Sequence, residues 1–381
     1  DTKSLTVEAV TVGVRPGDIV GVTLRDNGRT IAEARAAAGE PLLLTLSDMK
    51  LWTPDTPVLY DLEATLLRGG KPVDRVGSYA AMRKNSTVRG KEGFLRLQLN
   101  DRECFQFGPL DQGWWPDGLY TAPTDEALVY DIVKTKELGF NMIRKHVKVE
   151  PERWYWHCDR LGILVWQDMP NGGPSPEWQN NRYFNGAEAE RTARSEEQFR
   201  REWKEIIDQL YNHPSVVMWV PFNEAWGQFK TAEIARWTKD YDPTRIVNAA
   251  SGGNFYPDAG EVLDIHSYPH PRFYLFDIGR VNVIGEYGGI GLPLEGHLWQ
   301  PDRNWGYVRF KNAGEVTDEY IRYAEMLERL IPTGCSGAVY TQTTDVEIEV
   351  NGLMTYDRKR MKVDERRLRE VNRRLCRSLG Q

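Results

Sequence analysis

The sequence contains little cysteine. Its four cysteines, among 381 residues, are scattered along the chain as Cys104, Cys158, Cys335 and Cys376. They show no C-x-x-C spacing, which disfavours a zinc site or a dithiol redox motif. We interpret them as free buried thiols, because cysteine packs as a small apolar residue. They do not indicate the compartment in which the protein works.

Two further absences narrow the class of protein. The sequence has no run of about 18 apolar residues, so it predicts no membrane-spanning helix. It also has no excess of basic residues: 49 Lys and Arg stand against 55 Asp and Glu, a net charge of −6. This balance disfavours nucleic acid and membrane surfaces as partners. Because the chain lacks a leading Met and a signal peptide, we expect a processed or truncated piece of a longer protein.

Aromatic residues, by contrast, are abundant, with 13 Trp, 17 Tyr and 12 Phe. Several stand beside polar residues in expected loops, in the segments DQGWWPDGLY, GGPSPEWQNNRYF and GHLWQPDRNWGY. Aromatic faces rimmed by polar groups suit sugar rings, which carry C–H faces and hydroxyl edges. The alternative is that a ring folds back onto its own scaffold, and the sequence leaves this open for any single one.

The pattern of apolar residues changes near residue 85. Residues 1–84 alternate with period two in six short runs, separated by the turn signals RPGD, DNGR, GE and RGGK. This spacing predicts an immunoglobulin-like β-sandwich that serves as a scaffold. A helix over 34–38 is the weaker alternative for one run. The segment FLRLQLNDRECFQF then predicts a hairpin across an Asn-Asp turn, which leads into the second domain.

The second domain, residues 85–381, alternates short apolar strands with helical patterns. Strands are expected at 104–107, 141–144, 163–166, 216–222, 246–249, 262–265, 281–284 and 337–340. Clear helical patterns cover 124–138, 195–210 and 317–331. This alternation predicts a (β/α)8 barrel, whose helix ring is irregular because two connections, 249–262 and 265–281, are too short. A doubly wound open sheet is the alternative, but it would need a Gly-rich phosphate loop that the sequence lacks.

Polar residues cluster where the expected strands end, which in such a barrel is where the chemistry lies. Strands four and seven both end in glutamate, so Glu224 and Glu286 should face each other across the barrel mouth. Hydrolysis of a glycosidic bond needs such a pair: one carboxyl protonates the leaving oxygen and the other attacks the anomeric carbon. An ion-paired rim residue is the alternative for either glutamate alone.

Several segments resemble glycoside hydrolase family 2, which includes β-galactosidases, β-glucuronidases and β-mannosidases. These segments are SYAAMRK, GFNMIRKH, DRLGILVWQDMP, HPSVVMWVPFNEAWG and VIGEYGG, and the resemblance covers nearly the whole chain. By this resemblance, Glu224 is the general acid/base and Glu286 is the nucleophile. Asn223 would bond the sugar 2-hydroxyl, and Arg144 would lie beneath the nucleophile and hold its pKa down.

The resemblance implies further substrate-binding residues and no cofactor. Tyr268 would orient Glu286, and the terminal sugar would face His146, Asp111 and Asp168. The alternatives are a structural ion pair for Arg144, a satisfied rim histidine for His146, and a helix or loop cap for Asp168. His266 and His270 bracket Tyr268, but the proline in HSYPH excludes a helical i, i+4 pair, so we predict no metal site.

The chain also departs from the family pattern. The family usually carries a jelly-roll sugar-binding domain before the sandwich, and its absence here again suggests a truncated or processed fragment. GAVYTQTTDVE stands where members place a strand-eight tryptophan, so Tyr340 or Gln342 would occupy that region. Trp114 and Trp115 would then supply the missing sugar platform. The first-strand segment FQFGPLDQGWWPDG is poorer in Arg, His and Glu than in β-galactosidases, which leaves the substrate open.

We therefore predict a retaining exo-glycosidase that acts on a carbohydrate, with β-galactosidase-like specificity. The alternatives are β-mannosidase-like or β-glucuronidase-like specificity, the latter kept open by Lys145 and Lys148, and a carbohydrate-binding protein without turnover. A metal- or phosphate-dependent barrel enzyme is disfavoured, because no His/Asp ligand cluster or Gly-rich phosphate loop is present. A secreted or periplasmic location is the family-level expectation.

Overall fold

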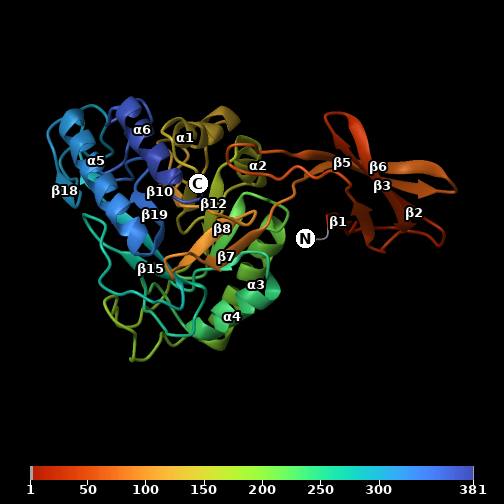
Figure 1. The fold of residues 1–381 in the computed structure, drawn as a ribbon, viewed down its shortest axis with the longest axis horizontal. Helices are drawn as coiled ribbons and strands as arrows, with labels where there is room; N and C mark the ends of the chain where they lie inside the picture. The colour runs from red at the N-terminus through yellow and green to blue at the C-terminus, as the bar shows by residue number, and fades with distance from the viewer. Residues whose placement is uncertain (1–2, 381) are drawn as a thin grey trace. The chain divides into compact units, whose positions relative to one another are not determined.

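A computed structural model describes residues 3–380, and the chain divides into two compact units, 1–83 and 84–381. Within residues 3–83, six strands form two antiparallel sheets (Figure 1). They are β1 (Ser4–Val7), β2 (Ile19–Asp26), β3 (Arg29–Ala37), β4 (Leu42–Thr45), β5 (Tyr60–Arg68) and β6 (Lys71–Ala80). One sheet has the order β3-β2-β5-β6 and the other pairs β1 with β4.

The period-two pattern of this unit builds its core. Val20, Val22 and Leu24 on β2, and Leu42 and Leu44 on β4, are at most 2% exposed, whereas the residues between them are not fully buried. The expected sandwich is confirmed, and the segment 34–38 belongs to β3 and its end rather than to a helix.

Three short antiparallel strands, together called the hairpin, begin the second unit. They are β7 (Asn85–Arg89), β8 (Leu95–Leu99) and β9 (Arg102–Glu103). The turn residues Asn100 and Asp101 both have positive φ, +55° and +61°, as a type I′ turn requires. Leu95 on β8 pairs with Val281, so the hairpin adjoins the strands of the barrel.

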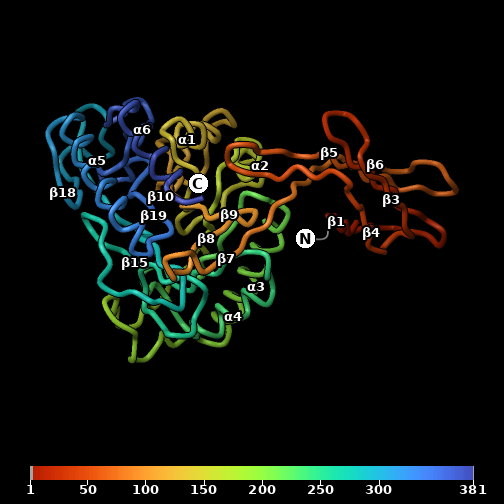
Figure 2. Tube along the Cα trace, viewed as in Figure 1, coloured from red at the N-terminus to blue at the C-terminus, as the bar shows by residue number. Residues whose placement is uncertain are grey.

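The barrel itself is built from parallel strands that are buried on both faces (Figures 1 and 2). In order around the barrel they are β10 (Gln106–Asp111), β11 (Met142–Lys145), β12 (Leu164–Asp168), β13 (Val216–Val220), β14 (Ile246–Val247), β15 (Val262–His266), β16 (Val281–Gly288) and β19 (Cys335–Thr341). β19 pairs with β10, which closes the ring on that side. Full burial explains why the strands read as continuous apolar runs rather than as alternating ones.

The ring closes between β14 and β15 without a regular ladder. The backbone N–H of Glu261 donates to the Val247 carbonyl at 2.8 Å, and that of Gly252 donates to the Asp264 carbonyl at 3.0 Å. The side chain of Asn248 adds a 2.6 Å bond to Asp264. The two strands are therefore held partly by side chains that also support the site described below.

The first barrel strand begins later than the sequence suggested, at Gln106 rather than at Cys104. The N–H of Cys104 still donates to the Leu97 carbonyl, so this residue belongs to the hairpin. Gly108 sits where the chain packs closely against β11: a Cβ there would lie 1.7 Å from the Met142 carbonyl oxygen. This close approach requires glycine.

Helices cover the strands (Figure 1). They are α1 (Asp125–Glu137), α2 (Glu152–Leu161), α3 (Ala193–Leu210), α4 (Thr231–Tyr241), α5 (Ala313–Leu330), the short η1 (Ile331–Thr333) and α6 (Glu365–Cys376). Thr124 caps α1 through its side chain, and Gly162 ends α2 with φ +71°. Within residues 3–380, no helix follows β14 or β15, as the short connections predicted.

Long segments without helix follow the carboxyl ends of several strands. Residues 169–192 run from β12 to α3, residues 292–307 join the short strands β17 (Ile290–Gly291) and β18 (Val308–Arg309), and residues 342–364 run from β19 to α6. Long irregular loops on a barrel usually carry function. Among the described residues, no helix is both long and apolar enough to cross a membrane.

Candidate active site

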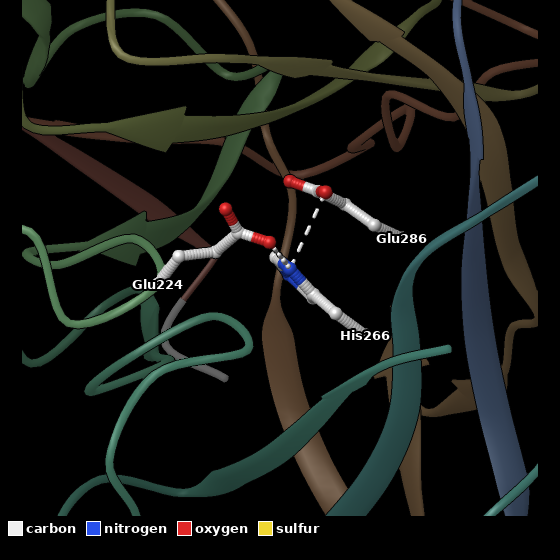
Figure 3. Close-up of side chains that lie close together, drawn as sticks. All are labelled: Glu224, His266 and Glu286. Atoms are coloured by element: carbon white, nitrogen blue, oxygen red, sulfur yellow. Dashed lines mark hydrogen bonds and ion pairs between the residues drawn. The ribbon is translucent and has the colours of Figure 1, made fainter. Parts of the chain in front are cut away.

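The side chains of Glu224, His266 and Glu286 converge at the carboxyl ends of the barrel strands (Figure 3). Glu224 follows β13, His266 ends β15, and Glu286 lies in β16. One ligating atom from each residue lies within 4.8 Å of the others. The Nδ1 atom of His266 is 2.9 Å from Glu224 Oε1 and 3.3 Å from Glu286 Oε2. The structure therefore brings together the two glutamates that the sequence singled out.

The backbone turns sharply to present Glu224. Glu224 and Ala225 have φ of +46° and +63°, a conformation that costs a non-glycine residue about 1–3 kcal/mol. The N–H of Glu224 donates to the Ser251 carbonyl at 2.9 Å, which anchors this turn to the next strand end. Strain of this kind is tolerated where the surrounding structure fixes a functional side chain.

Arg144 organises the floor of the site. This fully buried guanidinium binds Asp168 in a bidentate manner, with 3.1 and 2.8 Å bonds. It also donates to Glu286 Oε1 at 3.0 Å and to Asn223 Oδ1 at 2.6 Å. Burial alone would lower the pKa of Arg144, but the charges of Asp168 and Glu286 outweigh this effect. The pKa of Arg144 is therefore raised, and the guanidinium stays charged.

Tyr268 supplies the second donor to Glu286. Its hydroxyl donates to Glu286 Oε2 at 2.8 Å, and it must then accept from Thr341 Oγ1, which lies at 2.6 Å. Burial raises the pKa of Tyr268 well above its usual value, which keeps the donating proton in place. Its ring stacks on Tyr307 at a centroid distance of 3.7 Å. Each oxygen of Glu286 thus has a donor.

Asn223 and His146 complete the polar surface around the pair. Asn223 Nδ2 is buried and has no hydrogen-bond partner within residues 3–380. A buried amide N–H without a partner is costly unless a ligand accepts from it. His146 Nδ1 lies 3.3 Å from Asp168 Oδ2 and 4.0 Å from Glu286 Oε1.

Burial and neighbouring charges shift the pKa values of Glu224 and Asp168 in opposite directions. Burial raises the pKa of Glu224, and the opposing charges of His146 and Arg144 only partly offset this. Burial would also raise the pKa of Asp168, but Arg144 and His146 lower it below its ordinary value. Glu224 is therefore favoured as the proton carrier, whereas Asp168 stays ionised beside Arg144.

Sequence reasoning considered His266 only as half of a metal-binding pair. In the structure, His266 bridges both glutamates, and its Nε2 lies 2.8 Å from Ser251 Oγ. Ser251 Oγ in turn donates to Asp264 Oδ2 at 2.6 Å. Nε2 of His266 also lies 3.4 Å from Nη1 of Arg144, while Nδ1 faces both Glu224 and Glu286. Burial lowers the pKa of His266, which favours a neutral imidazole between the two carboxyl groups.

The same three side chains form a donor set that could hold a divalent cation. An imidazole and two carboxylates are common ligands of such ions. However, both oxygens of Glu286 already accept hydrogen bonds, from Arg144 and Tyr268. His270 is not part of this group within the described residues.

Two predicted substrate-binding residues, Asp111 and Gln342, lie outside this cluster. Asp111 is buried in an ion pair with Lys145, at 2.8 Å, rather than at the sugar-facing surface. Gln342 is buried between Gln112 and Asn351 and contacts neither glutamate directly. The amide groups of Gln342 therefore support the loop after β19.

Trp115 does not offer a sugar platform. Its side chain is only 6% exposed, and the guanidinium of Arg358 covers its ring at 3.8 Å. The aromatic residues that remain exposed near the site are Trp226, whose ring packs beside His146, and Trp305 and Tyr307. Their exposures are 40%, 40% and 46%, so they can offer the ring face that Trp115 cannot.

The fold and the site together define a class of protein: a β-sandwich linked to a (β/α)8 barrel with two carboxylates at the ends of its fourth and seventh strands. Residues 2–83 match the family model described as glycosyl hydrolases family 2, and residues 121–277 match its TIM barrel domain. These matches together cover more than half of the chain, and the chain belongs to glycoside hydrolase family 2.

Relatives of different named specificities are similar to this chain. A putative β-glucuronidase of Formosa agariphila is 28% identical over 60% of this chain and 21% of its own length. A β-galactosidase of Lactococcus lactis is 26% identical over 64% of this chain and 23% of its own length. A β-D-glucuronidase structure from Dictyoglomus thermophilum shares the fold, with a TM-score of 0.72 at 18% identity over 98% of this chain and 68% of that one. The chain spans about a fifth of these curated relatives.

Proposed function

We propose that this chain is a retaining glycoside hydrolase that releases a terminal sugar by double displacement. The observation that carries the proposal is the proximity of Glu224 and Glu286, whose nearest ligating atoms lie within 4.8 Å. Carboxyl groups about 5–5.5 Å apart suit a covalent intermediate, whereas inverting enzymes separate them by about 6.5–9.5 Å to admit water.

Glu224 acts first as the acid. Burial raises its pKa, which favours the protonated form that a general acid needs, and Nδ1 of His266 lies 2.9 Å from its Oε1. Glu224 donates it to the glycosidic oxygen as the bond to the anomeric carbon breaks. In the second step, ionised Glu224 removes a proton from the water that hydrolyses the intermediate.

Glu286 acts as the nucleophile. Arg144 and Tyr268 donate to its two oxygens, which fixes the direction of the carboxyl group. The carboxylate attacks the anomeric carbon and forms a glycosyl ester, which water later cleaves. The unpartnered Nδ2 of Asn223 can bond the sugar 2-hydroxyl, a contact that strengthens in the transition state.

The substrate is a carbohydrate, and the enzyme releases the sugar at the end of the glycan. β-Galactosidase-like specificity is the first candidate, and β-glucuronidase-like and β-mannosidase-like specificities are the others. Relatives named for all three activities support this range.

The test is a panel of nitrophenyl glycosides with Glu286→Ala, Glu224→Ala and the control Glu205→Ala, whose side chain is exposed on α3. We expect one glycoside to be cleaved and the Glu224→Ala rate to fall about 10²–10⁴-fold. Glu286→Ala should lose turnover and regain it with azide, which gives a product of inverted configuration. Unchanged turnover in both variants would overturn the assignment, and no turnover by the unmodified chain would favour a carbohydrate-binding protein.

A further inference from the structure

We propose that Glu349 sets the substrate class of this site: its carboxylate accepts hydroxyl groups of a neutral terminal sugar and repels the carboxylate of a uronic acid. This inference rests on the proposed glycosidase function. Neither the mechanism above nor the motifs found in the sequence use Glu349, which lies on the loop after β19.

Backbone pairing places Glu349 beside the loop that follows β17. Residues 346 and 349 bond each other in a tight turn, with N–H to carbonyl distances of 3.1 and 2.9 Å. The Trp305 N–H donates to the Ile348 carbonyl, and the Val350 N–H donates to the Trp305 carbonyl, both at 2.8 Å. Glu349 and Trp305 are therefore direct neighbours.

A line of aromatic rings joins this point to the nucleophile. The Trp305 ring packs against Tyr307 at 5.3 Å, and Tyr307 stacks on Tyr268 at 3.7 Å. Tyr268 donates to Glu286. A sugar whose anomeric carbon faces Glu286 would thus find exposed aromatic surface and Glu349 along the same wall.

The Glu349 carboxyl is half-buried and only lightly neutralised. Asn351 Nδ2 donates to its Oε1 at 2.8 Å, and the Gln342 amide is a second side-chain partner. The charged groups that act on it are Glu286 and His146. Burial raises the pKa of Glu349 to about 7, a shift that the amide of Asn351 reduces and the charge of Glu286 reinforces.

A buried ion pair holds this loop in place. Lys362 donates to Asp345 Oδ1 at 2.5 Å and to the Val350 carbonyl at 2.9 Å. The same Asp345 oxygen accepts from the Gly352 N–H at 2.8 Å. The backbone on both sides of Glu349 is therefore fixed, as specificity requires of a binding group.

The cations that would have suited a uronic acid are already paired. Lys145 binds Asp111 and Glu150, and Lys148 lies 2.9 Å from Glu150. Arg144 is likewise occupied by carboxylates on the floor of the site. The carboxylate of a bound uronic acid would therefore lie near Glu349 with none of these three cations free to pair with it. Like charges brought together disfavour binding.

The test compares matched nitrophenyl pairs, glucoside with glucuronide and galactoside with galacturonide, for the unmodified chain and Glu349→Gln. We expect kcat/KM of the unmodified chain to favour a neutral sugar by at least about 100-fold at pH 8. Glu349→Gln should narrow that preference at least tenfold, mainly by lowering KM for the uronide. Glu347→Gln, at an exposed position two residues away, is the matched control and should leave the preference unchanged.

A second measurement needs no variant. Because Glu349 is protonated below about pH 7, the preference of the unmodified chain should shrink as the pH falls from 8 to 5. A chain that prefers uronides, or an unchanged preference in well-folded Glu349→Gln, would overturn the inference. If no glycoside is cleaved, the proposed function fails separately, and equal binding of glucose and glucuronate by calorimetry would then count against Glu349.

Discussion

At the scale of single residues, the site depends on how buried charges are shared. Arg144 neutralises Asp168 and Glu286 together, and Tyr268 covers the second oxygen of Glu286. Burial raises the pKa of Glu224, and the charges of His146 and Arg144 only partly offset this effect. Carboxyl groups in one pocket can take different roles when their surroundings differ.

His266 should tune the proton on Glu224. Replacing it with leucine puts an apolar side chain beside Glu224, so the pKa of Glu224 should rise further and the alkaline limb of the kcat/KM profile should move to higher pH by about one unit. His266→Gln keeps a polar side chain beside Glu224 and should shift the limb less. The measurement is the pH dependence of kcat/KM on the cleaved glycoside. Identical profiles for both variants and the unmodified chain would contradict this role.

The residue scale also marks the limit of sequence reasoning about the site. Glu224 and Glu286 could be singled out because strand ends in a barrel converge at one rim. The resemblance to a known family then added Asn223, Arg144 and Tyr268. The failure of Trp115 as a platform could not be foreseen, since Arg358, which covers its ring, lies far away in the sequence.

At the scale of elements, α3 shows how strongly an amphipathic pattern predicts packing. The apolar stripe in the pattern expected over 195–210 faces inward: Phe199, Trp203, Ile207 and Leu210 are buried, and Ile206 is partly buried. Trp203 lies edge-on to Trp219 of β13 at 5.6 Å and donates to Thr238 of α4 at 2.9 Å. The helix therefore supports the strand whose end carries Asn223 and Glu224.

Trp203→Ala should lower the free energy of unfolding of the barrel by about 3–5 kcal/mol, because it leaves a large cavity and removes the hydrogen bond that the buried Thr238 hydroxyl accepts. Urea unfolding followed by tryptophan fluorescence and circular dichroism measures this change. Glu205→Ala, exposed on the same helix, should change it by less than about 0.5 kcal/mol. Equal effects of the two substitutions would show that this helix does not support the barrel.

Strand boundaries were less predictable than the helices. The apolar run Val216–Phe222 continues two residues beyond β13, because Pro221 and Phe222 are buried in the turn rather than paired in the sheet. β14 is also shorter than its run, since side chains such as Asn248 take over the closure of the ring. Apolar runs report burial, whereas a strand also requires a paired backbone.

At the scale of the whole molecule, each unit has its own buried core. The first unit is centred on Val20, Val22 and Leu24, and the second unit contains the separate clusters around α3 and α5. Units with separate cores can unfold in separate steps. This division allows the stability of the scaffold and of the barrel to be measured independently.

Scanning calorimetry should resolve two transitions. Leu24 is fully buried in the first unit. Leu24→Ala should lower the free energy of unfolding of only one transition, by about 2–5 kcal/mol. Trp203→Ala should lower only the other. A single transition that both substitutions shift equally would mean that the two units unfold as one.

The sequence by itself determined the sandwich, the barrel and the pair of glutamates. These follow from local periodicity and from the rule that strand ends share one rim, which are properties of short segments. Only the tertiary structure decided which groups meet there: His266 between the glutamates, Arg358 over Trp115, and Glu349 beside Trp305. These contacts join segments that are distant in the chain, and the periodicity of a short segment carries no information about them.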